Sequence, residues 1–139
     1  MTLQLHVQIV GALLLSLGIA HSLFSRYFGW EKELVALSVL TRRIFWVHCF
    51  FIALLLAMLG VCSLFYTNAL LQPTPLSRVI LVGIVAFWLC RLAIQFLVYD
   101  SAIWRGRPFY KFMNVVFSLF WSYVVITYSI ALRTVWNGG

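Results

Sequence analysis

Four long runs of apolar residues, separated by short polar segments, dominate the pattern of this chain. Each run holds about 20 residues, which at about 1.5 Å of helical rise per residue crosses a hydrocarbon layer of roughly 30 Å. The runs do not alternate between polar and apolar positions as membrane β-strands do, so helices are expected. The pattern predicts an all-α integral membrane protein, an up-down bundle of four transmembrane helices in a single domain over residues 1–139. The predicted helices cover residues 3–24, 44–66, 79–98 and 109–132.

The segments between the runs carry signals for helix ends. Residues 30–37 form a short amphipathic piece, expected to lie as an interfacial helix between the first two spans. The expected start residues are Ser38 or Thr41 for the second span, Thr74 with Pro75 for the third, and Pro108 for the fourth. The first run has no basic segment before it, so it is expected to stay in the mature protein.

Composition and charge agree with a membrane protein and suggest its orientation. The chain is 64% hydrophobic and 9% charged, more apolar than one soluble core can hold. Most of its lysines and arginines lie at two junctions, between spans one and two and between spans three and four. They are Arg26, Lys32, Arg42, Arg43, Arg105, Arg107 and Lys111. The positive-inside rule then places these junctions in the cytoplasm and both termini outside. Anionic lipid headgroups, and not nucleic acid, are the expected partners of this charge.

Two histidines lie at matching depths in the first two runs. His21 comes three residues before the end of the first run, and His48 comes four residues after the start of the second. Both are therefore expected roughly 5 to 6 Å inside the same membrane face. Two neutral imidazoles that face each other across a bundle can ligate the iron of a b-type haem. His6 stands on the order of 22 Å from His21 along the helix and is expected at the outer interface instead.

The first two runs also present recognisable faces. Small and polar residues share one stripe of the first helix, which is expected to meet other helices or a flat ligand. The stripe comprises Gln4, Gln8, Gly11, Gly18, His21 and Ser25. On the second helix, the face that carries His48 is expected to pack against neighbours or against the plane of an apolar cofactor. That face comprises His48, Phe51, Ile52, Leu55, Leu59 and Cys62.

Polar residues in the third and fourth runs are expected at the level of the histidines. Arg91, Gln95 and Tyr99 share one face of the third helix with Trp88. An arginine about 10 Å inside a membrane costs up to about 3 kcal/mol unless it is paired or reaches the interface. The expected partners of Arg91 are Asp100, a lipid phosphate or an anionic cofactor group, with snorkelling to headgroups as the alternative.

The fourth run carries Asn114, Ser118 and Ser122, four residues apart, with Trp121 beside them. This spacing is typical of a stripe of hydrogen bonds between helices. Asn114 lies at the level of the histidines and joins the expected site. The predicted cofactor-binding residues are therefore His21, His48, Arg91, Gln95, Tyr99 and Asn114, with His21 and His48 as metal ligands.

Other chemistries fit the composition less well. The three acidic residues, Glu31, Glu33 and Asp100, all lie at or beyond the helix ends, which disfavours a di-iron site. A catalytic zinc needs three protein ligands, whereas only two histidines of this chain are expected at the same depth. The three cysteines lie within apolar runs, show no paired spacing and are expected to be buried free thiols. No catalytic residue is assigned.

The sequence therefore predicts an accessory or electron-transfer subunit of a membrane complex, with a b-type haem or a quinone bound near the cytoplasmic face. The alternative is a structural or assembly subunit, or a lipid-binding membrane protein without a cofactor. Its expected partners are the lipid bilayer and other membrane-protein subunits or further copies of the chain.

Overall fold

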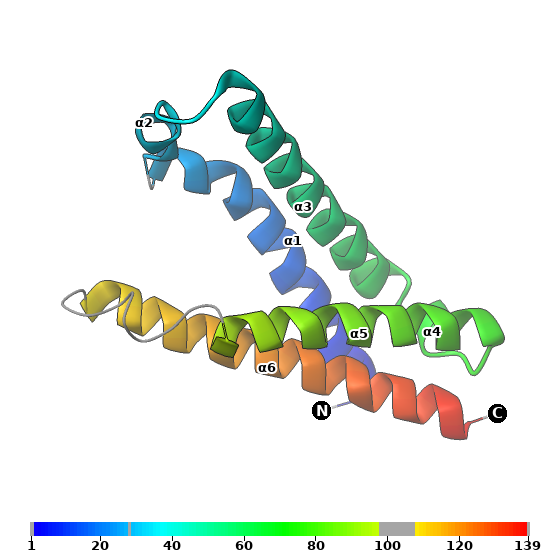
Figure 1. Cartoon of the computed structure of the whole chain (residues 1–139). Coiled ribbons are helices and arrows are strands. Elements are labelled where there is room, and N and C mark those ends of the chain that lie inside the picture. The colour runs from blue at the N-terminus through cyan, green and yellow to red at the C-terminus, as the bar shows by residue number, and fades with distance from the viewer. Residues whose placement is uncertain (1, 28, 98–107, 139) are drawn as a thin grey trace. The chain divides into compact units, whose positions relative to one another are not determined.

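The computed structural model describes residues 2–27, 29–97 and 108–138, and every regular element within them is a helix. Figure 1 shows their order along the chain. The helices are α1 (Leu3–Tyr27), α2 (Trp30–Leu34), α3 (Val39–Phe65), α4 (Thr67–Leu70), α5 (Pro75–Leu97) and α6 (Pro108–Asn137). Four stretches are long and apolar enough to cross a membrane: Leu3–His21, Val39–Phe65, Pro75–Leu97 and Lys111–Asn137. The prediction of an all-helical chain with four such helices is confirmed for the described residues.

The long helices extend beyond the apolar runs because their caps lie in the polar segments. Ser38 precedes α3, and its hydroxyl accepts the backbone N–H of Thr41 at 3.2 Å. Thr74 precedes α5 and accepts the backbone N–H of Ser77 at 3.1 Å. The predicted caps Ser38 and Thr74 are confirmed, as is the start of α6 at Pro108. A side-chain oxygen satisfies a backbone donor that the first helical turn leaves unpaired, so the helix begins there.

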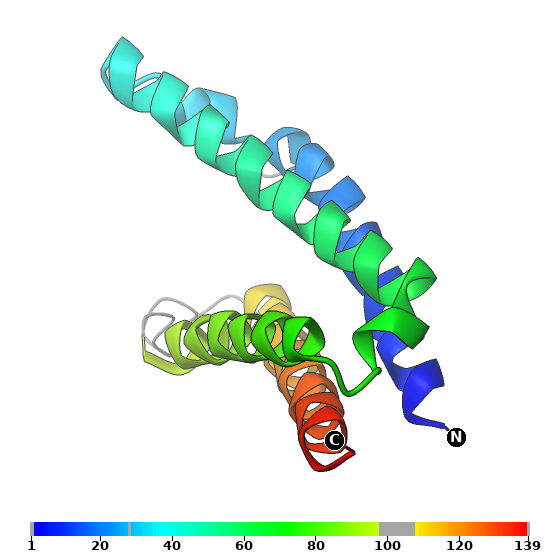
Figure 2. The same cartoon turned by 90° about the vertical axis from the view of Figure 1, so that its right-hand side faces the viewer.

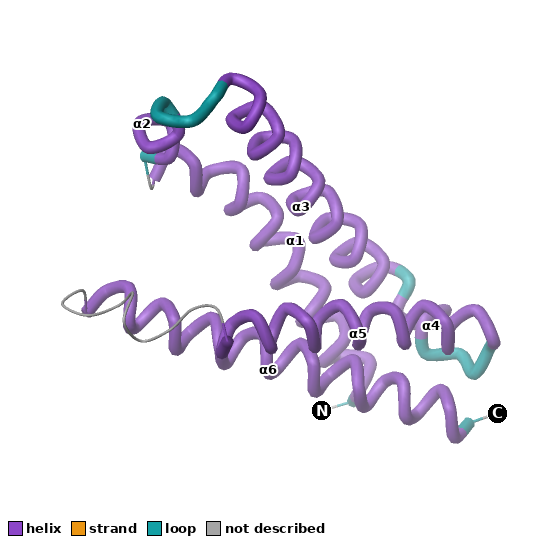
Figure 3. The backbone as a smooth tube through the Cα atoms, in the orientation of Figure 1, coloured by secondary structure: helices purple, strands orange, loops and turns teal. Residues whose placement is uncertain are grey.

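Two short helices lie next to the long ones, and Figure 3 separates them from the loops. The first, α2, falls within the amphipathic segment where a short helix was expected. Gly29 precedes it with a φ of 65°, a left-handed conformation that glycine adopts without steric cost. The second, α4, was not expected. The Thr67 hydroxyl at its start donates to the carbonyl of Ser63, in the last turn of α3.

The chain divides into two compact units, one of residues 8–67 and the other of residues 1–7 together with 68–139. In the unit of residues 8–67, α1 and α3 run side by side (Figure 1). Their backbones meet at glycines: a Cβ atom on Gly11 would lie 2.7 Å from the backbone nitrogen of Leu64, and one on Gly60 would lie 2.9 Å from the carbonyl oxygen of Gly11. A Cβ atom on Gly18 would lie 3.2 Å from the carbonyl oxygen of Ala53. The expectation that the small stripe of the first helix meets another helix is confirmed at Gly11 and Gly18.

In the other unit, α5 and α6 lie side by side, as Figure 2 shows from a second direction. The rings of Trp88 and Trp121 stack with centroids 4.9 Å apart and planes 20° from parallel. Gln95 donates from its amide nitrogen to Asn114 Oδ1. From Trp88 to Gln95 the chain advances seven residues along α5, while their partners go back seven residues along α6, from Trp121 to Asn114. The two helices are therefore antiparallel.

The same unit includes residues 1–7. One of them, His6, is hydrogen-bonded through Nδ1 to the Tyr123 hydroxyl at 2.9 Å.

Candidate functional site

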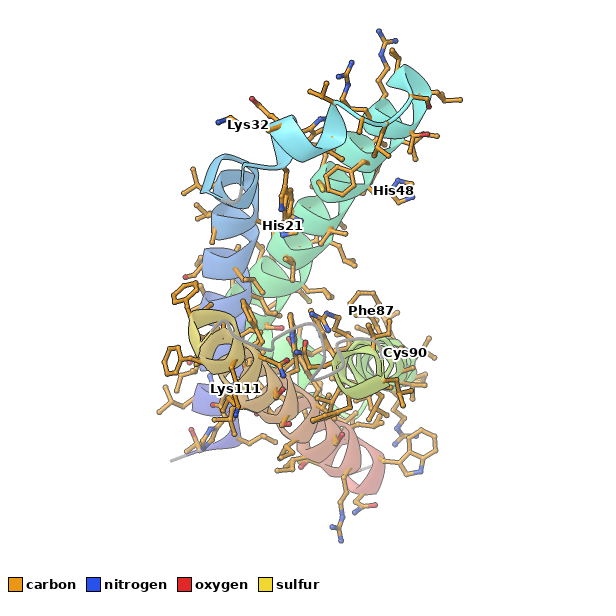
Figure 4. The ribbon with its side chains drawn as sticks, turned by 60° about the vertical axis from the view of Figure 1, so that its left-hand side comes forward. His21, Lys32, His48, Phe87, Cys90 and Lys111 are labelled. Atoms are coloured by element: carbon orange, nitrogen blue, oxygen red, sulfur yellow. The ribbon has the colours of Figure 1, made fainter. Side chains whose placement is uncertain are left out.

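The two predicted metal ligands belong to the same unit but lie on different sides of it. His21 is half-buried, whereas His48 is exposed. Figure 4 shows His21 between α1 and α3, and His48 on the side of α3 that is turned away from α1. A helix turns about 100° per residue, so His48 lies about 120° around α3 from Gly60, the residue that contacts α1. The two imidazoles therefore do not face each other across the α1–α3 contact.

The face of α3 that packs inside the unit is not the face predicted from the sequence. Its buried residues are Leu56, Gly60 and Ser63. Phe51 and Ile52, which share the predicted face with His48, are 59% and 48% exposed. All sides of α3 are apolar, so hydrophobicity cannot single out the contact face. Close approach to Gly11 selects the side with the smallest residues, and that side carries Gly60.

The exposed imidazole of His48 is held by its own helix. Its Nδ1 donates to the backbone carbonyl of Ile44, 2.8 Å away. A carbonyl oxygen only accepts, so Nδ1 carries a proton, and in the neutral imidazole the lone pair is then on Nε2. A ligating histidine is commonly fixed by such a bond, which leaves Nε2 to bind a metal. Among the described residues, no three His, Cys, Asp or Glu side chains come together as a metal-binding group.

Three of the predicted site residues meet between α5 and α6. Arg91 donates from its guanidinium to Gln95 Oε1 at 3.1 Å, and Gln95 in turn donates to Asn114 Oδ1. The guanidinium carbon of Arg91 lies 4.8 Å from the ring centroid of Trp121, a cation–π contact. We call Arg91, Gln95, Asn114 and Trp121 the arginine cluster. The sequence predicted its three polar members together.

Two contacts of Arg91 were not among its expected partners. They are the amide of Gln95, in the next turn of the same helix, and the ring of Trp121, on the facing helix. A signal for the ring was present, because Trp121 lies seven residues after Asn114 and hence on the same face of α6. Tyr99 and Asp100, the remaining predicted residues of this region, lie outside the described residues.

The serines of α6 are engaged differently from the prediction. Ser118 donates to the carbonyl of Asn114, and Ser122 donates to the carbonyl of Ser118, each at 2.8 Å. Both bonds lie within α6, so of the predicted interhelical stripe only Asn114 bonds across to α5. A serine hydroxyl is short and lies close to the carbonyl four residues before it, which makes this back-bond the nearest available.

Two further expectations concern His6 and the cysteines. His6 was expected at the outer interface without a specific partner, yet it pairs with Tyr123 through the hydrogen bond and an edge contact of the rings at 6.0 Å. Cys49, Cys62 and Cys90 are all free, as predicted, but the prediction that they are buried is wrong, because Cys49 and Cys62 are half-buried and Cys90 is exposed.

The predicted site residues are divided between the two units. His21 and His48 belong to the unit of residues 8–67, whereas Arg91, Gln95 and Asn114 belong to the other. The convergence of all of these residues on one cofactor therefore stays a prediction.

Comparison of the chain with known protein families, proteins and structures finds no match. No family model matches the chain, and neither a curated protein nor a solved structure matches it. The class of the protein therefore follows from its own fold. Over the residues that the structure describes, the chain is all-helical, with four helices long and apolar enough to span a membrane.

Proposed function

We propose that this chain is a small integral membrane protein that serves as a non-catalytic accessory subunit of a membrane complex. In this proposal its four long helices form an up-down bundle, with both termini outside and the two basic junctions in the cytoplasm. The observation that carries the proposal is that several polar side chains within the apolar helices bond to other groups of the same chain. Arg91, Gln95 and Asn114 bond to one another, His6 bonds to Tyr123, and His48 bonds to its own backbone.

The physical argument rests on what lipid demands of polar groups. A polar group in hydrocarbon needs a partner, and side-chain bonds between helices supply one while holding the helices together. An active site instead directs several polar groups towards one cavity. The bonds of the described polar residues fit the first arrangement. The outward faces of the helices are apolar, as at Phe50, Met58 and Phe65 of α3, and such faces suit lipid or a membrane-protein neighbour.

An electron-transfer subunit with a b-type haem is the second candidate, and one observation favours it. The bond from His48 Nδ1 to Ile44 leaves Nε2 with the lone pair that would coordinate iron. In this candidate α3 turns about its axis to bring His48 towards His21, or His48 ligates a haem shared with another chain. For a quinone or lipid pocket without metal, the described residues provide no comparable supporting contact.

An optical spectrum and a native gel of the detergent-solubilised protein separate the two candidates. The accessory role predicts a colourless purified chain that migrates with a larger complex in mild membrane extracts. A reducible haem spectrum, lost in both His21→Ala and His48→Ala and kept in His6→Ala, would overturn it in favour of electron transfer. Migration only as the isolated chain, whatever detergent is used, would also contradict the accessory role.

A further inference from the structure

Two arginines lie at the end of the α5–α6 pair where α5 begins and α6 ends. Arg78 comes three residues after Pro75, the first residue of α5, and Arg133 comes four residues before Asn137, the last residue of α6. At about 1.5 Å of rise per residue, both lie within about 6 Å of a helix end. The helices are antiparallel, so these two ends are neighbours, and Figure 1 shows them at the same side of the pair.

The ring of Trp136 adjoins both arginines. The guanidinium carbon of Arg78 lies 5.7 Å from the centroid of this ring, a cation–π contact that holds the side chain towards α6. Arg133 precedes Trp136 by three residues, so the two side chains are neighbours on the surface of α6. Trp136 is 58% exposed, and Arg133 is exposed as well. We call Arg78, Arg133 and Trp136 the helix-end cluster.

The guanidinium of Arg78 has unused donors. Its Nε is buried and has no hydrogen-bond partner in the described structure. The terminal nitrogens, Nη1 and Nη2, bond to no described residue either, but they stay accessible, because Nε alone is buried without a partner and the side chain is half-buried. A buried N–H of a charged group without an acceptor raises the free energy of the folded chain. An anion at the terminal nitrogens would offset this cost, since the charge is delocalised over the whole guanidinium.

The acidic side chains of this unit are too far away to supply that anion. Helices α5 and α6 contain neither Asp nor Glu, and the sequence of residues 1–7 and 68–139 contains a single acidic residue, Asp100. It follows Leu97, the far end of α5, which is about 28 Å of helix from Arg78. Three residues of chain span at most about 10 Å. The charge of the helix-end cluster is therefore open to an anion from outside the unit.

The surface around the cluster fits a lipid better than a soluble anion. Leu76 and Val79, on either side of Arg78 in the sequence, are 69% and 71% exposed. Exposed tryptophan and aliphatic side chains beside a cation near a helix end are typical of the level where headgroups meet hydrocarbon. A phospholipid offers a phosphate to the cation and acyl chains to the apolar residues, whereas a soluble anion offers only the first contact.

We propose that the helix-end cluster binds the phosphate of an anionic phospholipid headgroup. This inference rests on the membrane insertion of the proposed function, and it deepens that function by naming a lipid partner. The guanidinium of Arg78 donates from its terminal nitrogens to phosphate oxygens, a paired contact that a single ammonium group does not make. Arg133 supplies a second positive charge, and Trp136 is a positioning residue that holds Arg78 in place.

Photo-cross-linking of the full chain in phosphatidylcholine nanodiscs tests the proposal. The probe is phosphatidylglycerol with a diazirine in its headgroup. Mass spectrometry of peptides reads the cross-link at residues 133–137, so lipid bound elsewhere on the chain is not counted. Arg78→Gln should raise the mole fraction of probe that gives half-maximal cross-linking about tenfold, the loss typical of a charge-assisted contact. Arg78→Lys keeps the charge but loses the fork, and should raise it by a smaller factor.

Circular dichroism checks that each variant keeps its helices. If Arg78→Gln does not fold, Arg78→Lys and Trp136→Leu carry the test, because both keep the charge and lose its geometry. Loss of the ring contact in Trp136→Leu should raise the half-maximal mole fraction about threefold.

Lys111→Gln is the matched control. Lys111 is an exposed cation at the other end of α6, about 33 Å of helix from Arg133 (Figure 4). Its loss lowers the net charge by the same single unit as Arg78→Gln. The half-maximal mole fraction at residues 133–137 should stay within about twofold if the cluster, and not net charge, binds the lipid.

The remaining outcomes each overturn the proposal. Equal loss in Lys111→Gln and Arg78→Gln would show a general charge effect. Unchanged cross-linking in Arg78→Gln, Arg78→Lys and Trp136→Leu would remove the cluster from lipid binding. Suppression of the cross-link by millimolar inorganic phosphate would show that the site takes a free anion. Lipid binding is measured on the isolated chain, so a chain that binds lipid here but joins no larger complex would refute the accessory role and leave this site intact.

Discussion

The two helix pairs of this chain are held together by opposite means. In the unit of residues 8–67, α1 and α3 approach until backbone touches backbone at Gly11, Gly18 and Gly60. In the other unit, α5 and α6 are joined by large rings and by a chain of side-chain hydrogen bonds. Lipid tails are as apolar as leucine, so burial alone does not drive helices together in a membrane. Close backbone packing can hold two membrane helices together, and so can polar or aromatic contacts. The α1–α3 pair uses the first, and the α5–α6 pair uses the second.

The difference predicts opposite sensitivities to mutation. The α1–α3 contact tolerates no added atom at its glycines, whereas the α5–α6 contact depends on large groups and is weakened by their removal. Three substitutions, each measured as the free energy of unfolding in detergent, examine this contrast.

The largest effect is expected for Trp121→Ala in the α5–α6 pair. The side chain is 4% exposed, stacks on Trp88 and covers the guanidinium of Arg91. Its loss removes both contacts and leaves a cavity, at a cost of about 3 kcal/mol. Trp136→Ala on the same helix is the control. Trp136 is 58% exposed, so this change should cost less than about 1 kcal/mol. Equal effects of the two changes would mean that the stacked pair does not hold α5 to α6.

Addition of one methyl group should have the next largest effect, in the α1–α3 pair. The Cβ of Gly11→Ala would lie 2.7 Å from the backbone of Leu64, so the helices must separate, at a cost of about 2 kcal/mol. Gly83→Ala in α5 is the matched control, because nothing lies within 4 Å of its added Cβ. Alanine favours a helix over glycine by up to about 1 kcal/mol, so Gly83→Ala should be neutral or stabilising. If both changes had the same sign, the glycine contact between α1 and α3 would be refuted.

The smallest effect is expected for Gln95→Leu. The change removes the bonds to Arg91 and Asn114, and hydrogen bonds between membrane helices contribute on average about 0.6 kcal/mol each. A loss of about 1 kcal/mol is expected. A double-mutant cycle with Asn114→Leu should show a coupling of about 0.6 kcal/mol between the two side chains. Zero coupling would mean that the amide pair does not contribute to the α5–α6 contact.

Much of the fold could be predicted from the sequence because it depends on local properties. Apolar runs of membrane length, the caps at Ser38 and Thr74, and the start of α6 at Pro108 are each set by residues close to one another in the chain. Helical spacing was also enough to place Arg91 and Gln95 on one face, and their bond lies within α5. These predictions succeeded because hydrogen bonding within a helix is the same whatever surrounds it. Asn114 was grouped with them by its depth in an antiparallel pair.

Which sides of the helices meet was decided only by the tertiary structure. The sequence gives α3 apolar residues on every side, so hydrophobicity could not reveal that Gly60 faces α1 and that His48 is turned outward. It also could not show that Trp121 covers Arg91, or that Ser118 and Ser122 bond within their own helix. These outcomes depend on the fit of side chains between two helices, and a rotation of about 100°, one residue's turn, changes every such contact.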